Sequence, residues 1–192
     1  MHGHRKIWVK LLKRVKVHGI YGNHDNFSLL NSLRNSDGVK MLAEDGEVRE
    51  IGGLLFGFVN GIVNEKHAEK ESVPRKTSLF FVQIAEALRN VNVLCMHESP
   101  VLPDYGESIT RTVGTEAARK AIEVSQPDLA LSGHLHLSDA FTVSSIGRTI
   151  AVRIDSSQQE RHYAILEPEK QLFQILNDSG TVLQMFLGET KE

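Results

Sequence analysis

Three short apolar runs in this chain each end in a turn that carries histidine, and this pattern restricts the folds open to it. The runs are predicted strands at residues 17–21, 91–96 and 128–131. The turns that follow read Gly22-Asn23-His24-Asp25, His97-Glu98 and Gly133-His134-Leu135-His136. In a mostly parallel sheet the carboxyl ends of the strands meet at one edge, where open α/β sheets bind ligands. We therefore expect the three turns to converge.

The last of these turns carries two histidines two positions apart. Residues i and i+2 of an extended chain point to the same face, so the imidazoles of His134 and His136 can converge on one site. Gly133 lets the backbone leave the strand without the clash of a β-carbon. Neutral imidazoles suit divalent ions such as zinc, manganese, iron or cobalt. The alternative is a pair of surface histidines on a loop, and the two other histidine turns favour the metal site over it.

The composition is that of an ordinary globular domain. The 192 residues are 41% hydrophobic and 24% charged, so the chain is long enough to bury a core. Its formal net charge of −2 implies no general attraction to nucleic acid or to anionic lipid. A single domain over residues 1–192 is therefore expected.

The location of the protein is predicted from what the sequence lacks. Cys95 is the single cysteine, so no intrachain disulfide forms and an intracellular compartment is expected. No run of 18 apolar residues is present, which predicts no transmembrane helix. Lysines interrupt every apolar stretch near the N-terminus, unlike in a signal peptide. We expect a cytoplasmic protein without a membrane anchor.

The two parts of the chain differ in pattern. Helices and strands alternate over residues 1–137, with helices expected at 4–15, 26–33, 77–90 and 115–124, and further strands at 39–42, 48–51 and 54–60. Residues 138–192 carry five strand candidates and no helix between them, at 141–146, 149–154, 162–166, 171–176 and 182–187. A second sheet formed by this antiparallel β-meander, stacked on the first, gives an α/β sandwich with one core.

Taken together, the three turns resemble the last three sequence blocks of the calcineurin-like metallophosphoesterases. The matching blocks are Gly22-Asn23-His24-Asp25, Met96-His97-Glu98-Ser99-Pro100 and Gly133-His134-Leu135-His136. The order of the blocks and the elements between them match as well, over residues 1 to about 155. The resemblance implies a four-layer α/β/β/α sandwich of the metallo-dependent phosphatase type.

The resemblance also implies a metal centre. Asn23, His97 and His134 are the implied ligands of one ion of a dinuclear pair, and His136 is an implied ligand of the other. The ions would be divalent, such as Mn, Fe, Zn, Co or Ni. Two such ions activate a bound water molecule and clamp the phosphate oxygens during hydrolysis of the ester.

Two residues of the first turn have implied catalytic roles. His24 is implied to stand near the scissile phosphate, where it stabilises charge or protonates the leaving oxygen. Asp25 is implied to orient His24 by accepting a hydrogen bond from it. Substrate contacts are sought in the loops at residues 61–76 and 101–113, where Lys66, Arg75, Lys76 and Arg111 are candidates.

The sequence departs from the family pattern at its start. The family's Asp-x-His and Gly-Asp blocks precede Gly-Asn-His-Asp, yet Asp25 is the first aspartate here. We therefore expect an N-terminally truncated sandwich in which the carboxylates of the second metal are absent, so that one metal site or none is complete. The open sheet edge of such a chain would pair with a second copy or a partner.

Three functions remain open at this stage. The first is a metal-dependent phosphoesterase acting on a phosphorylated small molecule or a nucleotide, impaired by the absent blocks. The second is a non-catalytic metal-binding or scaffold protein of the same fold. The third is nucleic-acid processing or binding through a basic first helix. The basic residues of that helix and the segment after it are Arg5, Lys6, Lys10, Lys13, Arg14 and Lys16.

Overall fold

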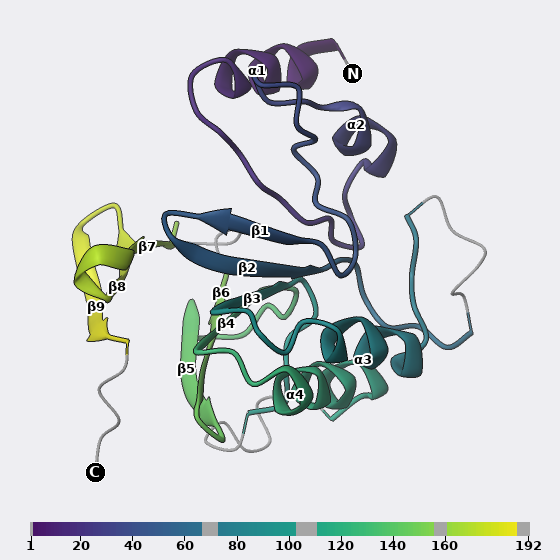
Figure 1. Ribbon diagram of the computed structural model, residues 1–192, viewed down its shortest axis with the longest axis vertical. Helices are drawn as coiled ribbons and strands as arrows, with labels where there is room; N and C mark the ends of the chain where they lie inside the picture. The colour runs from purple at the N-terminus through teal and green to yellow at the C-terminus, as the bar shows by residue number, and fades with distance from the viewer. Residues whose placement is uncertain (1, 67–72, 103–110, 156–160, 188–192) are drawn as a thin grey trace.

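A six-stranded mixed sheet forms the centre of the fold, as the computed structural model shows in Figure 1. The structure describes residues 2–66, 73–102, 111–155 and 161–187, with side chains described from residue 6 onward. The strands lie in the order β1-β2-β3-β4-β6-β5. Their bounds are β1 Val48–Ile51, β2 Leu54–Val59, β3 Val93–Met96, β4 Leu129–Ser132, β5 Phe141–Ile146 and β6 Thr149–Ile154.

The four inner strands of this sheet, β2, β3, β4 and β6, run parallel to one another. They are short and apolar because both faces of the sheet are covered, as is usual for parallel strands. Leu94 and Ala130, which pair across β3 and β4, are both almost fully buried. The edge strands β1 and β5 pair antiparallel with their neighbours through tight turns. The carboxyl ends of β3 and β4 therefore lie side by side.

One face of the sheet is covered by two helices, α3 (Ser78–Glu86) and α4 (Val113–Ser125). Thr77 and Thr112 cap their first turns by accepting hydrogen bonds from backbone amides three residues further on. The helices pack against each other and against the sheet with buried side chains such as Phe81 and Ile122. Both helices agree with the sequence prediction, although α3 ends earlier than expected.

The other face is covered by a three-stranded antiparallel sheet made of β7 (Tyr163–Glu167), β8 (Leu172–Asn177) and β9 (Gly180–Phe186). The short 3₁₀ helix Pro168–Lys170 connects β7 to β8. Phe173 and Ile175 of β8 are fully buried in one cluster with Val93 and Leu129 of the large sheet. Two sheets thus enclose an apolar layer, as expected for a sandwich.

The predicted fold class, an α/β sandwich with a C-terminal antiparallel sheet, is confirmed. Two of the five strands expected in the meander lie elsewhere, because β6 pairs with β4, and β5 pairs with β6, at one side of the large sheet. The alternation of buried and exposed residues predicts a strand but not the sheet it joins, and this accounts for the difference. Helices α1 (His2–Leu12) and α2 (Phe27–Ser32) lie at one end of the molecule, beyond β1 and β2 (Figure 1).

The strands expected at residues 17–21 and 39–42 are not formed as such. In the described part of the chain these segments meet only in an isolated parallel bridge between Gly19 and Leu42. The amide of Gly19 donates to the carbonyl of Met41, and the amide of Ala43 donates to the carbonyl of Gly19. Side chains form hydrogen bonds with backbone groups that would otherwise pair in a full β-ladder, because buried polar groups need hydrogen-bond partners.

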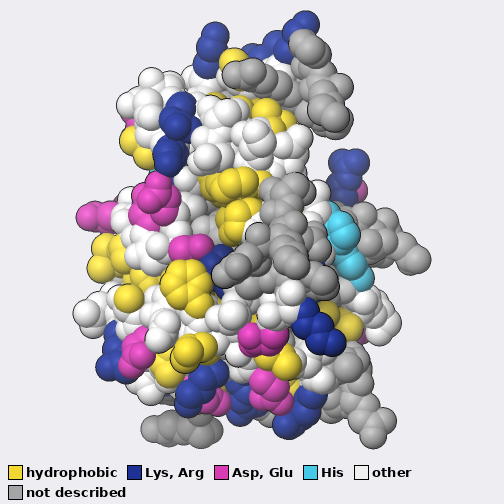
Figure 2. All heavy atoms as spheres, turned by 90° about the vertical axis from the view of Figure 1, so that its right-hand side faces the viewer, with side chains coloured by type: hydrophobic (Ala, Val, Ile, Leu, Met, Phe, Trp, Pro, Cys, Tyr) yellow, Lys and Arg dark blue, Asp and Glu magenta, His cyan; other side chains and the backbone are white. Residues whose placement is uncertain are grey.

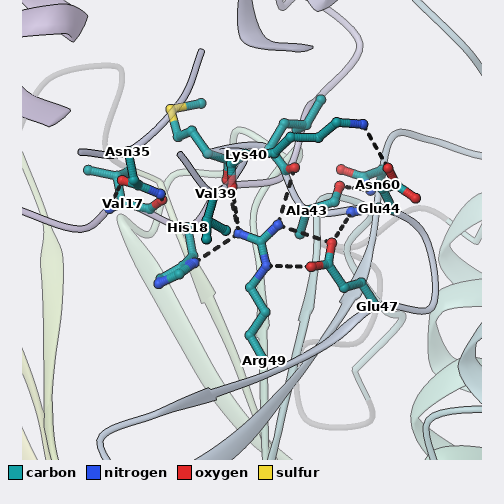
Figure 3. Close-up of polar contacts among 12 residues, drawn as sticks. Val17, His18, Asn35, Val39, Lys40, Ala43, Glu44, Glu47, Arg49 and Asn60 are labelled. Atoms are coloured by element: carbon teal, nitrogen blue, oxygen red, sulfur yellow. Dashed lines mark hydrogen bonds and ion pairs between the residues drawn. The ribbon is translucent and has the colours of Figure 1, made fainter. Parts of the chain in front are cut away.

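Arg49 of β1 makes several hydrogen bonds that attach these segments to the sheet (Figure 3). Its guanidinium donates to the carbonyls of Lys40, Met41 and Leu42 at 3.0, 3.4 and 3.3 Å. It also lies 2.8 Å from Nδ1 of His18. Glu47 receives two further bonds at 2.8 and 3.0 Å, so the buried charge is paired as well as hydrogen-bonded. One side chain therefore ties residues 18 and 40–42 to the sheet.

A second buried cation holds the next residues of the same segment. The ammonium of Lys76, whose side chain is 4% exposed, donates to the carbonyl of Asn60 at 2.6 Å and lies 2.9 Å from a carboxylate oxygen of Asp45. It also donates to the hydroxyl of Tyr21 at 3.4 Å. Asn60 in turn accepts a hydrogen bond from the amide of Tyr21 at 3.0 Å. Tyr21, which directly precedes the first histidine turn, is fixed from two sides.

No described helix is long and apolar enough to cross a membrane.

Replacement of Arg49 by methionine should cost about 3 kcal/mol in the free energy of unfolding, because three carbonyls and Glu47 each lose a hydrogen-bond donor, and the side chain that supplied it is buried. Urea denaturation followed by circular dichroism measures the loss. The matched control is Arg89→Met, since Arg89 pairs with Glu86 on the surface and should contribute less than about 1 kcal/mol. Equal losses in the two variants would contradict the role given to Arg49.

Candidate functional site

The second and third histidine turns meet because β3 and β4 pair in parallel with Cys95 opposite Leu131. Beyond the strands the contact continues: the amide of Gly133 donates to the carbonyl of His97 at 3.3 Å, and the hydroxyl of Ser99 donates to the carbonyl of Gly133. The rings of His97 and His134 consequently lie with their centroids 5.1 Å apart.

The first turn approaches His97 from the neighbouring segment. Gly22 lies so close to the imidazole that a Cβ at this position would come within 2.4–2.8 Å of three ring atoms. Nε2 of His97 lies 3.1 Å from the amide oxygen Oδ1 of Asn23. The glycine thus creates the space in which the side chains of His97 and Asn23 meet, although 74 positions separate them in the chain.

Asp25 has a different partner from the one expected. Its carboxylate accepts a hydrogen bond from the amide of Gly22 at 2.7 Å, which closes the turn upon itself. The described residues contain no hydrogen bond from His24 to Asp25. His24 is exposed, and a proton on it would lower the pKa of both His97 and His134, so it lies close to the pair. Histidine side chains reach the surface near one another on the face shown in Figure 2.

The protonation of the two central histidines follows from their environment. Burial, followed by the proximity of His134, lowers the pKa of His97 to about 4. Burial also lowers the pKa of His134, with further contributions from His136 and His24. Both imidazoles are therefore neutral at pH 7. Neutral imidazole is the form that binds metal ions.

His134 adopts a left-handed backbone conformation, with φ at 67°. Such a conformation is uncommon for residues other than glycine and concentrates at functional sites. Its Nε2 lies 3.8 Å from Oε1 of Glu98. Glu98 is only 3% exposed, and burial raises the pKa of its carboxyl group. Its other oxygen accepts a hydrogen bond from the amide of Val63 at 3.0 Å.

A cleft of about 330 Å³ opens beside His134 and Glu98. Residues 62–66 and 112–114 form its remaining walls, so described parts of both loops expected near the site do lie there. Lys66 is at its edge. Lys76, another candidate for a phosphate contact, is instead buried in its pair with Asp45, and Arg111 pairs with Glu116. The rest of the two loops, residues 67–72 and 103–110, lies outside the described residues.

His136 is held by a residue that the sequence reasoning did not identify. Its Nδ1 lies 2.9 Å from Oδ2 of Asp155, just beyond the end of β6. Arg153 of the same strand donates to the carbonyl of Leu135 at 2.9 Å. Arg153 and Asp155, two positions apart at the end of an apolar strand, break its pattern, and that break was the available signal. Glu98 was likewise missed as a site residue, although it directly follows His97.

The chemistry of the donor set fits a divalent ion. An amide oxygen and an imidazole nitrogen 3.1 Å apart, with a second neutral imidazole alongside, are typical metal donors. Among the described histidines, cysteines and acidic residues, no group of three is arranged to hold a metal ion. Asn23 lies outside that set of residue types, so its amide oxygen would complete the site.

Solved structures of known proteins share the fold. A protein named TT1561 from Thermus thermophilus aligns with a TM-score of 0.54 and 17% identity, over 72% of this chain and 60% of that one. A second solved structure aligns with a TM-score of 0.55 and 14% identity, over 96% of this chain and 71% of that one. This chain thus spans about three fifths of the length of TT1561. No curated protein sequence gave a significant match.

The sequence blocks and the fold agree with a family assignment. Residues 3–138, well over half of the chain, match the family model described as calcineurin-like phosphoesterase, and the match includes all three histidine turns. Proteins of this family generally hydrolyse phosphate esters with divalent metal ions. This chain belongs to the calcineurin-like phosphoesterase family.

Proposed function

We propose that this chain hydrolyses phosphate esters by means of a divalent metal ion held by Asn23, His97 and His134. The observation that carries the proposal is the 3.1 Å approach of Nε2 of His97 to Oδ1 of Asn23, with the ring of His134 beside them. Two donor atoms of one ion lie at about this separation when each is about 2 Å from it. Three protein ligands leave further positions open for water and substrate.

The protein prepares these ligands before any ion binds. Burial keeps both imidazoles neutral, so no proton has to leave when the ion enters. Gly22 leaves room for the His97 ring, and the buried Lys76 and Asn60 fix Tyr21 one residue earlier. When bound, the ion would lower the pKa of a water molecule and draw charge from the phosphate oxygens.

His24 is the proposed catalytic residue. It is exposed at the tip of the first turn, next to the central histidines, where an imidazole can reach a bound phosphate from solvent. There it would stabilise charge on the phosphate or give a proton to the leaving oxygen. Asp25 supports this role indirectly, because its bond to the amide of Gly22 fixes the turn on which His24 stands.

A single ion per chain is proposed for residues 1–192. The family's dinuclear centre would use His136 for the second ion, but the sequence here contains no Asp-x-His or Gly-Asp block to complete it. A three-ligand site without a carboxylate leaves the charge of the ion uncompensated, so we propose slow turnover. The proposed substrate is a phosphorylated small molecule or a nucleotide, bound in the cleft beside His134. Which divalent ion binds depends on the ions available in the cell as much as on the types of ligand.

The second candidate is a metal-binding or scaffold protein without activity. It is favoured by the fact that histidines and acidic residues in the described chain do not form a three-membered metal group by themselves. Elemental analysis together with turnover separates the two functions. One ion per chain with no hydrolysis would support the scaffold, whereas hydrolysis that depends on that ion would exclude it.

The basic N-terminal helix and the open sheet edge remain predictions about partners. The side chains of Lys6, Lys10 and Lys13 are exposed on α1 and just after it, at the end of the molecule where Figure 2 shows a group of Lys and Arg side chains. Binding to nucleic acid through them would weaken steeply with salt. Association of two copies is measured by light scattering.

Removal of either central histidine should abolish activity. The enzyme loaded with Mn²⁺ is expected to hydrolyse bis(p-nitrophenyl) phosphate or p-nitrophenyl phosphate, and His97→Ala and His134→Ala should each lower kcat/KM at least about 100-fold, because each removes one of three ligands. His24→Ala should lower kcat while leaving the affinity for Mn²⁺ unchanged. Chelation should stop the wild-type reaction and added Mn²⁺ should restore it. Equal rates in wild type and both ligand variants would contradict the proposal.

Gly22→Ala should weaken the site without removing any ligand. The new Cβ would come within 2.4–2.8 Å of the His97 ring, so the imidazole must move away from Asn23. We expect a loss of about tenfold or more in affinity for Mn²⁺, measured by isothermal titration calorimetry.

Gly19→Ala is the matched control for this change. Gly19 lies in the same segment, and a Cβ there would only touch the end of Met41 at 3.7 Å. Its affinity for Mn²⁺ should equal that of the wild type. Equal affinity in the Gly22→Ala variant would show that the ring does not depend on the glycine.

A further inference from the structure

We propose that Glu98 selects the alcohol part of the substrate. One oxygen of its carboxylate faces the cleft beside His134 and accepts a hydrogen bond from a hydroxyl or ammonium group of that alcohol. The inference rests on the proposed function, since it names the class of ester that the same site takes: phosphate esters of a short alcohol that carries an O–H or N–H donor. Glu98 is thus a specificity-determining residue rather than a ligand of the ion.

The two carboxylate oxygens of Glu98 differ in their partners. Oε2 accepts a hydrogen bond from the amide of Val63 at 3.0 Å. Oε1 lies 3.8 Å from Nε2 of His134, which is too far for a hydrogen bond, and no other donor in the described chain reaches it. Among the described side-chain atoms that are both fully enclosed and without a partner, Oε1 of Glu98 is not included, so a ligand in the cleft can reach it.

An unpaired acceptor on this side chain favours a ligand that donates. The side chain of Glu98 is only 4% exposed, so water satisfies its free oxygen poorly. A buried polar atom without a partner is costly, and a donor group of the substrate would offset that cost. A site of this kind discriminates strongly against an analogue that lacks the donor, because the analogue leaves the acceptor unpaired.

The carboxylate is held in place by the backbone on two sides. Val63 lies in a segment tied to Lys76, because the amide of Asn64 donates to the carbonyl of Lys76 at 2.8 Å and the amide of Lys76 donates to the carbonyl of Ile62 at 3.1 Å. The amide of Val63 is therefore a fixed donor. Gly114, in the first turn of α4, lies so near that a Cβ there would come within 2.8–3.0 Å of three carboxylate atoms.

The charges around the cleft orient the substrate. A phosphate group is repelled by the carboxylate of Glu98, so it stays at the central histidines while the alcohol enters the cleft. Lys66 is the single Lys or Arg among the described residues that line the cleft, and it is exposed. Because Oε1 lies 3.8 Å from the imidazole of His134, the donor group must be only a few bonds from the ester oxygen. The cleft, of about 330 Å³, has room for such an alcohol.

Binding of three matched phosphonates tests the proposal without any turnover. The probes are 2-aminoethylphosphonate, 2-hydroxyethylphosphonate and propylphosphonate, which differ in one terminal group and have no ester bond to hydrolyse. The backbone amide signals of Val63 and Gly114 report binding in ¹H–¹⁵N spectra, with and without Zn²⁺. We expect propylphosphonate to bind at least about tenfold more weakly than the better of the other two. Whether the amino or the hydroxyl probe binds more tightly identifies the donor.

Two variants should remove this preference. In Glu98→Gln the amide oxygen can still accept from Val63, and its NH₂ group then faces the cleft as a donor. Gly114→Ala keeps the carboxylate but forces it to move. In both, the ratio of the dissociation constants should fall to below about threefold. A purely structural change would weaken all three probes equally and leave the ratio unchanged.

Glu65→Gln is the matched control. It removes a negative charge from the same cleft, but Glu65 is exposed and its Oε1 accepts from the amide of Ser78. Its ratio should equal that of the wild type, which separates the role of Glu98 from a general effect of charge.

Three results would overturn the proposal: a wild type that binds propylphosphonate as tightly as the other probes, an unchanged ratio in Glu98→Gln, or no binding of any probe in either metal state. Failure of the proposed function gives a different result. If the protein loaded with Mn²⁺ hydrolyses neither 2-aminoethyl phosphate nor 2-hydroxyethyl phosphate, the phosphoesterase is wrong, whereas a ratio that depends on Glu98 still establishes its role in binding.

Discussion

The parallel pairing of β3 with β4 is the constraint on which the rest of the site depends. Because Cys95 pairs with Leu131, the residues that directly follow the two strands lie next to each other. The bond from the amide of Gly133 to the carbonyl of His97 extends this pairing into the turns. The strands are held by burial of apolar side chains on both faces, which resists any shift of register. The geometry of two histidines is therefore a by-product of core packing.

The turns that lie outside the ladder are held by buried cations. Arg49 binds the segment before the first turn, Lys76 binds Tyr21 at its entrance, and Arg153 binds the carbonyl between His134 and His136. Burying a charge is costly, and the cost is offset only when the surrounding carbonyls and carboxylates are all paired. Each cation thus fixes several backbone groups in one geometry. Such positions tolerate replacement poorly, because the loss of one partner leaves the others unsatisfied.

Local pattern predicted the strands and helices well. The expected bounds of β1, β5 and β6 agree with the structure, and Thr77 begins α3 as its capping role indicates. The strand predicted at residues 17–21 was wrong, since the described chain forms only an isolated bridge at Gly19, and the amides of Val17 and Tyr21 donate to the side chains of Asn35 and Asn60. Pairing with side chains from distant segments leaves no local signal. For the same reason the sequence did not reveal that Glu98 and Asp155 stand beside His134 and His136.

The sequence by itself determined the family, the strand-and-turn pattern and the residue types of the centre, because periodicity and short motifs are local properties of a chain. It named Asn23, His97, His134 and His136 as residues to expect together. Only the tertiary structure decided their partners. In the structure the carboxylate of Asp25 accepts a hydrogen bond from the amide of Gly22, and the carboxylate of Asp155 lies within hydrogen-bond distance of His136. The first of these contacts is local to the turn, whereas the second is set by the register of β4 against β6, two strands that the sequence order does not place next to each other.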